Sequence, residues 1–198
     1  DTFCIQSKKN VPKLKQFLNN KAINKIFIKP VGGNSGLGTS RHERPFSNLS
    51  NTLDKRFINN KFKKLVVQRF MNFSTPDSPE YKCLYVGGKL QYIVKTFKLG
   101  FFNGIIFPTD KSWKYTVKID TLSKKVIKLF SNKMKTDIPF CRVDWGYDKL
   151  NDTFFLNEFE HAGGTYGEDV VHNLKVVSPK KWKVDVELAK SIVNFVKN

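Results

Sequence analysis

Cysteine and histidine are scarce in this 198-residue chain, and each occurs at only three positions. The cysteines, Cys4, Cys83 and Cys141, are widely spaced, so their pattern predicts neither a disulfide framework nor a zinc site. No apolar run is long enough to span a bilayer, and no signal peptide is recognisable. We therefore expect a cytoplasmic protein without membrane contact.

Acidic residues are also few. Only 17 Asp and Glu oppose 35 Lys and Arg, which gives a formal net charge of +18. A dispersed basic surface attracts polyanions, so an acidic substrate such as a glutamate-rich peptide, or a nucleic acid, would be drawn to this chain. Biased composition is the alternative explanation, because Lys, Asn, Phe and Ile are all abundant.

A chain of this length can bury a core as one domain of two lobes or as two small subdomains. Apolar residues at helical spacing predict three helices, over residues 11–20, 122–134 and 185–196. Asn10 is expected to cap the first helix. Residues 100–120 are expected to form a loop that faces a substrate.

The strongest chemical signal is a group of charged residues near the C-terminus. Arg142 and Asp144 are two positions apart on one predicted strand, so they share a face. A short polar turn joins this strand to the next. By the same alternation, one face of that next strand carries Phe154, Leu156, Glu158 and Glu160. Acids on a half-buried sheet are costly unless a cation neutralises them, and hard oxygen ligands suit magnesium. The alternative is an exposed strand face with scattered charges.

A glycine-rich segment over residues 26–40 gives a second signal. An apolar strand ends in Lys29, and the loop that follows contains Gly32, Gly33, Gly36 and Gly38. Glycines allow backbone N–H groups to approach a phosphate closely, and Lys29 would add a point charge. By itself the segment is equally consistent with a plain flexible loop, because it lacks the Gly-Lys-Ser/Thr ending of a P-loop.

Two further segments complete the pattern. Residues 64–73 predict a buried strand that is followed by a polar loop. Residues 80–98 predict a β-hairpin, because two strand-forming runs flank the pair Gly87 and Gly88.

Taken in order, these four blocks resemble the ATP-grasp superfamily, in particular carboxylate–amine ligases of the D-alanine–D-alanine ligase and ribosomal-protein glutamate ligase kinds. The resemblance covers residues 26–167. It implies an α+β fold of two lobes, each with an antiparallel sheet and helices, and a nucleotide between them. We expect residues 1–70 to form the first lobe, with the glycine-rich loop, and residues 71–198 to form the second, with the metal site.

The resemblance also implies roles for individual residues in binding ATP and Mg2+. Lys29 would contact the phosphates and, together with Arg142, serve catalysis. Arg142 would stabilise the transferred phosphoryl group or the acyl phosphate. The implied magnesium ligands are Asp144, Glu158 and Glu160.

The implied ATP-binding residues lie in all four blocks. The glycine-loop backbone would cover the phosphates, and the backbone of Phe70 and Met71 would bond adenine. Glu80 would bind the ribose, either Lys95 or Lys98 a phosphate, and Leu156 would form the floor of the adenine pocket. The full set is Lys29, Gly33, Ser35, Gly36, Gly38, Gln68, Phe70, Met71, Glu80, Lys95, Lys98 and Leu156.

Three features depart from the family pattern. Gln68 replaces the usual glutamate of the interlobe segment, and Glu160 replaces the usual asparagine of the last metal ligand. The chain also begins too close to Lys29 to hold the N-terminal substrate domain and the earlier phosphate-binding lysine. Either Lys8 or Lys9 takes the place of that lysine, or the sequence is a fragment or a reduced form of the family pattern.

The implied reaction is ATP-dependent ligation, in which a carboxylate takes the γ-phosphate and an amine displaces it. Both substrates would be small molecules or peptides, and acidic ones are among the candidates if the net charge is functional rather than a bias of composition. His161 follows the metal strand directly and is either a substrate or phosphate contact or a loop residue. The alternative function is a basic nucleic-acid-binding or structural protein that keeps the fold without ligase activity.

Overall fold

The computed structural model describes residues 2–31, 38–58, 64–73, 75–97, 101–106 and 113–161. The chain divides into two compact units, Asp1–Met71 and Asn72–Asn198, and each unit is described by itself. None of the α-helices in the described ranges is long and apolar enough to cross a membrane.

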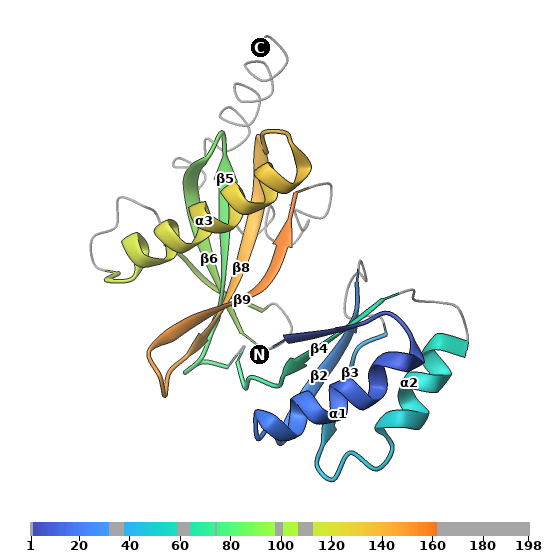
Figure 1. Ribbon diagram of the computed structural model, residues 1–198. Helices are drawn as coiled ribbons and strands as arrows, with labels where there is room; N and C mark the ends of the chain where they lie inside the picture. The colour runs from blue at the N-terminus through green and yellow to red at the C-terminus, as the bar shows by residue number, and fades with distance from the viewer. Residues whose placement is uncertain are drawn as a thin grey trace. The chain divides into compact units, whose positions relative to one another are not determined.

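The first unit is an antiparallel sheet of four strands with two α-helices (Figure 1). The strand order is β1-β4-β2-β3. Its elements are β1 (Thr2–Ile5), the short 3-10 helix η1 (Lys8–Asn10), α1 (Val11–Asn20), β2 (Lys25–Pro30), β3 (Ser40–Glu43), α2 (Leu49–Ile58) and β4 (Leu65–Arg69).

Alternation and helical spacing explain the core of this unit. Ile26 and Ile28 are fully buried because they occupy one face of β2, and Leu14 and Leu18 are buried because they lie one turn apart on α1. The helix begins where the sequence predicts, but the predicted capping role of Asn10 is wrong. Its side-chain oxygen instead accepts hydrogen bonds from the backbone N–H groups of Gln6 and Ser7, at 3.1 and 3.2 Å.

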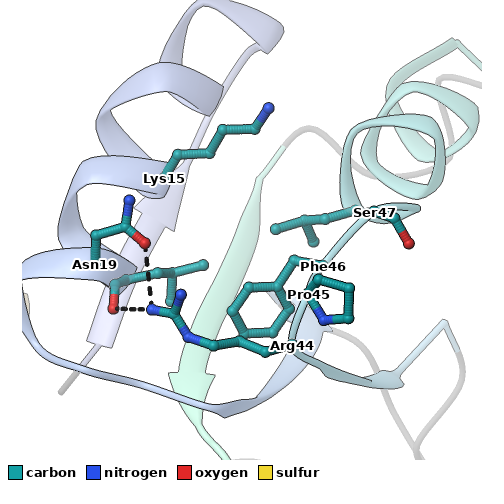
Figure 2. A pocket seen from close by; sticks show the side chains of 8 residues that line it. Lys15, Asn19, Arg44, Pro45, Phe46 and Ser47 are labelled. Carbon is teal, nitrogen blue, oxygen red and sulfur yellow. Dashed lines mark hydrogen bonds between the residues drawn. The ribbon is translucent and has the colours of Figure 1, made fainter.

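Arg44 ties the end of α1 to the loop between β3 and α2 (Figure 2). Its guanidinium donates to the carbonyl oxygens of Leu18 and Ile23, at 3.1 and 3.0 Å, and to the side chain of Asn19 at 3.2 Å. Leu18, Asn19 and Arg44 also border a surface cavity of about 290 Å³. Since none of the predicted site residues lines this cavity, we do not assign it to the site.

The second unit is an antiparallel sheet of five strands in the order β7-β6-β5-β8-β9. Its elements are β5 (Glu80–Val86), β6 (Lys89–Phe97), β7 (Phe101–Ile106), α3 (Thr116–Met134), β8 (Phe140–Asp148) and β9 (Thr153–Glu160). The helix α3 crosses one face of the sheet (Figure 1). The core between the helix and the sheet includes Cys83, Ile119, Cys141 and Val143, which are fully buried.

The expected loop over residues 100–120 is wrong within the described part of that range. Residues 101–106 form β7, which pairs with β6, and residues 116–120 form the first turn and a half of α3. The helix therefore begins six residues before the predicted start at Leu122, because Ile119 continues its buried face. The helix predicted over residues 185–196 lies outside the described residues.

A β-bulge between β8 and β9 overturns the simple alternation predicted for β9. The register pairs Asp144 with Glu158 but Trp145 with Leu156, so Asn157 is an extra residue. Phe154 consequently lies on the helix-covered face, where it packs on Tyr81 at a centroid distance of 5.8 Å. Strict alternation places Phe154 and Glu158 on one face, and the extra residue separates them.

Gly146 accommodates an aromatic ring on the open face of the sheet, which is the face that α3 does not cover. A Cβ atom at Gly146 would lie 2.1 Å from the ring of Phe155, which is its register partner on β9. The same ring meets Phe73 edge-on at a centroid distance of 5.1 Å.

We predict that Gly146→Ala displaces the Phe155 ring and lowers the free energy of unfolding by about 1–3 kcal/mol. Phe155→Leu should remove the clash, so the double variant should be more stable than the sum of the two single effects. Urea denaturation of all four proteins measures this coupling. Strict additivity of the two changes would contradict the proposed contact.

Candidate functional site

The open face of the second unit carries a buried carboxylate, Asp144, whose side chain is 1% exposed. Arg142 binds it with two nitrogens: Nε donates to Oδ1 at 2.8 Å and Nη2 to Oδ2 at 2.9 Å. Lys82 donates from Nζ to Oδ2 at 3.1 Å. Two cations therefore neutralise one buried acid, and charge-assisted bonds of this kind are among the strongest in proteins.

The two cations extend the network to further acids. Arg142 Nη2 lies 3.1 Å from Glu160 Oε2, and Lys82 Nζ lies 3.3 Å from Glu80 Oε2. Glu80 also accepts hydrogen bonds, from Asn157 Nδ2 at 2.7 Å and from Thr96 Oγ1 at 3.3 Å. We call the five charged residues the charge network: Glu80, Lys82, Arg142, Asp144 and Glu160.

Strand register brings these residues together. Lys82 lies directly opposite Asp144 on the neighbouring strands β5 and β8, and Glu80 lies two residues away on the same face. On the other side of β8, Arg142 is paired with Glu160 and Asp144 with Glu158. Period-two alternation along three adjacent strands is sufficient to place the network on one face.

Burial and the opposite charges act on the pKa values of this network. Burial disfavours the charged form of Lys82, but the carboxylates of Asp144 and Glu80 outweigh it and raise the pKa of Lys82. Burial also disfavours the charged form of Arg142, but the hydrogen bonds to Asp144 outweigh it and raise the pKa of Arg142. The pKa of Glu160 is raised because of its burial and the nearby charges of Glu158 and Asp144, which Arg142 and Lys82 only partly offset.

The predicted magnesium ligands are close in register but are not preassembled. In the described ranges of the chain, no three His, Cys, Asp or Glu side chains form a group able to hold a metal ion. Arg142 and Lys82 instead contact both oxygens of Asp144. The donors still fit magnesium chemically, because all are hard oxygens and carboxylates outnumber cations on this face. A bound ion would share the Asp144 carboxylate with these two side chains or displace them.

Some predicted residues of the second unit lie away from the network. Lys95 pairs in register with Tyr81, which belongs to the helix-covered core, and its phosphate contact stays a prediction. Leu156 lies opposite Trp145 beside the bulge and is 37% exposed, and its adenine-floor role stays a prediction. His161 is exposed beside Phe159. Lys98 lies outside the described residues.

The predicted residues of the first unit are placed as follows. Lys29 is half-buried in β2, and Gln68 in β4 donates to the Thr2 hydroxyl at 3.4 Å. The N–H group of Phe70 already donates to the Lys25 carbonyl at 2.9 Å, so only the Phe70 carbonyl remains for the predicted adenine contact.

The described part of the glycine loop is short. Gly38 adopts a positive φ of 76°, which glycine tolerates without strain. Met71, the last residue of the unit, is half-buried. The other predicted loop residues, Gly33, Ser35 and Gly36, lie outside the described residues.

Sequence reasoning missed Lys82, Thr96 and Asn157. For Lys82 a signal existed, because it follows Glu80 by two positions in a predicted strand and so shares its face. For Thr96 and Asn157 none existed, because their contacts with Glu80 depend on pairing register and on the bulge.

We predict that Glu160→Gln is more stable than the wild type at pH 7 in the absence of magnesium. With its raised pKa, Glu160 protonates more readily in the folded chain than in the unfolded chain, so its contribution to stability falls as pH rises above the ordinary value of 4.5. The advantage of the variant should disappear below pH 4.5. Urea denaturation between about pH 4 and pH 7.5 measures it.

Glu43→Gln is the matched control, because Arg41 and Lys25 lower the pKa of the exposed Glu43. A lowered pKa adds stability above the ordinary value that is lost as pH falls, so this variant should be slightly less stable than the wild type at pH 7. The same sign for both variants would contradict the electrostatic assignment of Glu160.

Structural comparison places the chain among known folds, although no protein-family model and no curated protein sequence matches it. Similar solved structures include the D-cycloserine synthetase DcsG (TM-score 0.66, 13% identity, covering 98% of this chain and 63% of that one). D-alanyl-alanine synthetase A from Vibrio cholerae has a TM-score of 0.65 and 13% identity, over 100% and 60% of the two chains.

The ATP-grasp ligase PsnB, solved with a phosphomimetic variant of its minimal precursor, Mg and ADP, has a TM-score of 0.59 and 8% identity over 99% and 53% of the two chains. The chain thus spans 53–63% of the length of these three proteins. At such identities the likeness establishes architecture. Together with the two antiparallel sheets and their helices, it confirms the α+β prediction: the chain has the fold of the ATP-grasp superfamily.

Proposed function

We propose that this chain is the nucleotide-binding part of an ATP-dependent carboxylate–amine ligase. The observation that carries the proposal is the charge network, in which Arg142 and Lys82 lie against Asp144 on the open face of the sheet. Neighbours in fold support it: a D-alanine–D-alanine ligase from Bacillus anthracis was solved with ATP, and PsnB with Mg and ADP.

The chemistry of the proposed reaction suits these side chains. The carboxylate substrate attacks the γ-phosphorus of ATP, ADP leaves, and the amine then attacks the acyl carbon and expels phosphate. No protein nucleophile takes part, so catalysis depends on positioning and on neutralising the phosphoryl oxygens. Magnesium would be held by Asp144, Glu158 and Glu160 and would neutralise phosphate charge.

Arg142 is assigned to the transferred phosphoryl group. Its planar guanidinium is held by two bonds to Asp144, and this fixes the direction of the remaining donors before a ligand arrives. A fixed charge of this kind acts most strongly in the transition state, where the negative charge of the phosphoryl oxygens is being redistributed.

Lys82 is assigned as a positioning residue. Its ammonium group joins Asp144, a predicted metal ligand, to Glu80, the predicted ribose ligand. Without Lys82, these two buried carboxylates would repel each other on the same face of the sheet. The residue therefore keeps the acids in place while the site is free of magnesium.

We predict that ATP with magnesium raises the melting temperature of the wild type and that Lys29→Ala removes most of the shift. Ligand at 100 times its Kd adds about 2.7 kcal/mol to the free energy of unfolding. Lys25→Ala is the control, because Lys25 lies on the same strand and face but is exposed and pairs with Glu43 at 3.3 Å. No shift in the wild type at millimolar nucleotide would refute the proposal.

We predict that Arg142→Lys keeps nucleotide binding but lowers turnover at least about tenfold, because lysine cannot reproduce the two-nitrogen contact with Asp144. Glu158→Gln should abolish turnover without unfolding the chain, since Glu158 is exposed. Release of ADP and mass spectrometry of products, with ATP, magnesium and pooled amino acids and peptides, measure both effects. Unchanged turnover per folded molecule in Glu158→Gln would make this acid structural.

A further inference from the structure

The helix α3 has two faces of opposite character. Its inner face is buried on the sheet through Ile119 and Ser123, and Ser123 accepts a hydrogen bond from the Trp145 ring nitrogen at 2.8 Å. Its outer face carries lysines together with the exposed apolar side chains of Val117, Leu129 and Met134. Seven lysines in and beside the helix are exposed: Lys114, Lys118, Lys124, Lys125, Lys128, Lys133 and Lys135.

Three of these lysines have partners within the second unit. Lys124 forms an ion pair with Asp120 at 2.8 Å, Lys118 donates to the Asp152 carbonyl at 3.1 Å, and Lys114 lies over the Tyr115 ring. Asp120 is the one acid in the helix. Among the described residues, no carboxylate pairs with the other four, which we call the α3 lysine face: Lys125, Lys128, Lys133 and Lys135.

This clustering is unfavourable for the isolated helix. Lys124 and Lys128 are four positions apart, and Lys125 and Lys128 are three apart, so like charges are neighbours on one surface. Only Lys133 lies in the last turn, where the helix dipole favours a cation. A bound polyanion would turn this repulsion into attraction.

The form of the surface favours a nucleic-acid backbone over an acidic protein. A duplex carries one phosphate charge per about 1.7 Å of its axis, whereas an extended polypeptide carries at most one carboxylate per about 3.3–3.6 Å, and lysine binds phosphate as a point charge. The helix has 19 residues and is about 28 Å long, and because its inner face is buried on the sheet, its lysines can meet phosphates on the outside of a duplex without the helix entering a groove.

We propose that the α3 lysine face is a docking surface for the phosphate backbone of a double-stranded nucleic acid. Contacts with phosphate alone give affinity without sequence preference, and the net charge of +18 adds long-range attraction. The inference is independent of the ligase proposal, because none of the four lysines belongs to the charge network.

The test compares two triple variants that lose the same charge. Lys125, Lys128 and Lys133 are changed to Gln in one, and the exposed Lys9, Lys13 and Lys15 of the first unit are changed to Gln in the other. Anisotropy of a labelled 20-base-pair DNA duplex and of the RNA duplex of the same sequence is measured between 50 and 200 mM salt. Melting temperature and ATP binding report on folding.

We expect the α3 variant to bind the duplex about tenfold or more weakly at 50 mM salt, with a log–log salt slope reduced by about two to three, because each phosphate contact contributes about 0.9. The control variant should lose much less affinity for the duplex, and the melting temperature should be unchanged in both variants. Equal losses in the two variants would overturn the proposal, since net charge alone would then explain binding. The proposal would also be overturned if the wild type did not bind the duplex at 50 mM salt. The same holds if polyglutamate displaced the labelled duplex more effectively than unlabelled duplex does.

Discussion

The second unit is organised around the burial of one charged carboxylate. Removing an ionised acid from water costs several kcal/mol unless its charge is paired and its oxygens are bonded. Asp144 meets this requirement through Arg142 on its own strand and Lys82 on the neighbouring strand. The order of the strands suits this requirement, because β8 lies between β5, which brings Lys82, and β9, which brings Glu160 to Arg142.

The sequence predicts the elements of this arrangement well, because local rules control them. Alternation predicts that Arg142 and Asp144 share a face, and helical spacing predicts α1 and most of α3. The rest depends on pairing between distant segments. The bulge at Asn157 reverses the face of Phe154, and the register of β6 places Lys95 opposite Tyr81. Neither can be derived from a period of two, because one inserted residue changes every orientation beyond it.

The comparison with solved ligases illustrates how much sequence a fold can lose. Identities of 8–13% leave few residues in common between this chain and the three ligases. A core tolerates extensive substitution if its volume and pattern are kept, so the architecture persists. The site is stricter, because the side chains on the open face must pair with one another. Motif order does not single out Lys82, although strand alternation alone places it on the same face as Glu80.

The position of Lys82 between Glu80 and Asp144 also makes the two acids thermodynamically dependent on each other. A cation that binds Asp144 competes with the ammonium group, which then interacts more strongly with Glu80. A ligand that binds Glu80 instead strengthens the interaction of the Lys82 ammonium group with Asp144. Linkage requires the two effects to be equal in free energy, so occupancy at either acid must change affinity at the other by the same factor. One side chain of the sheet would therefore couple the two positions in free energy, without any movement of the backbone.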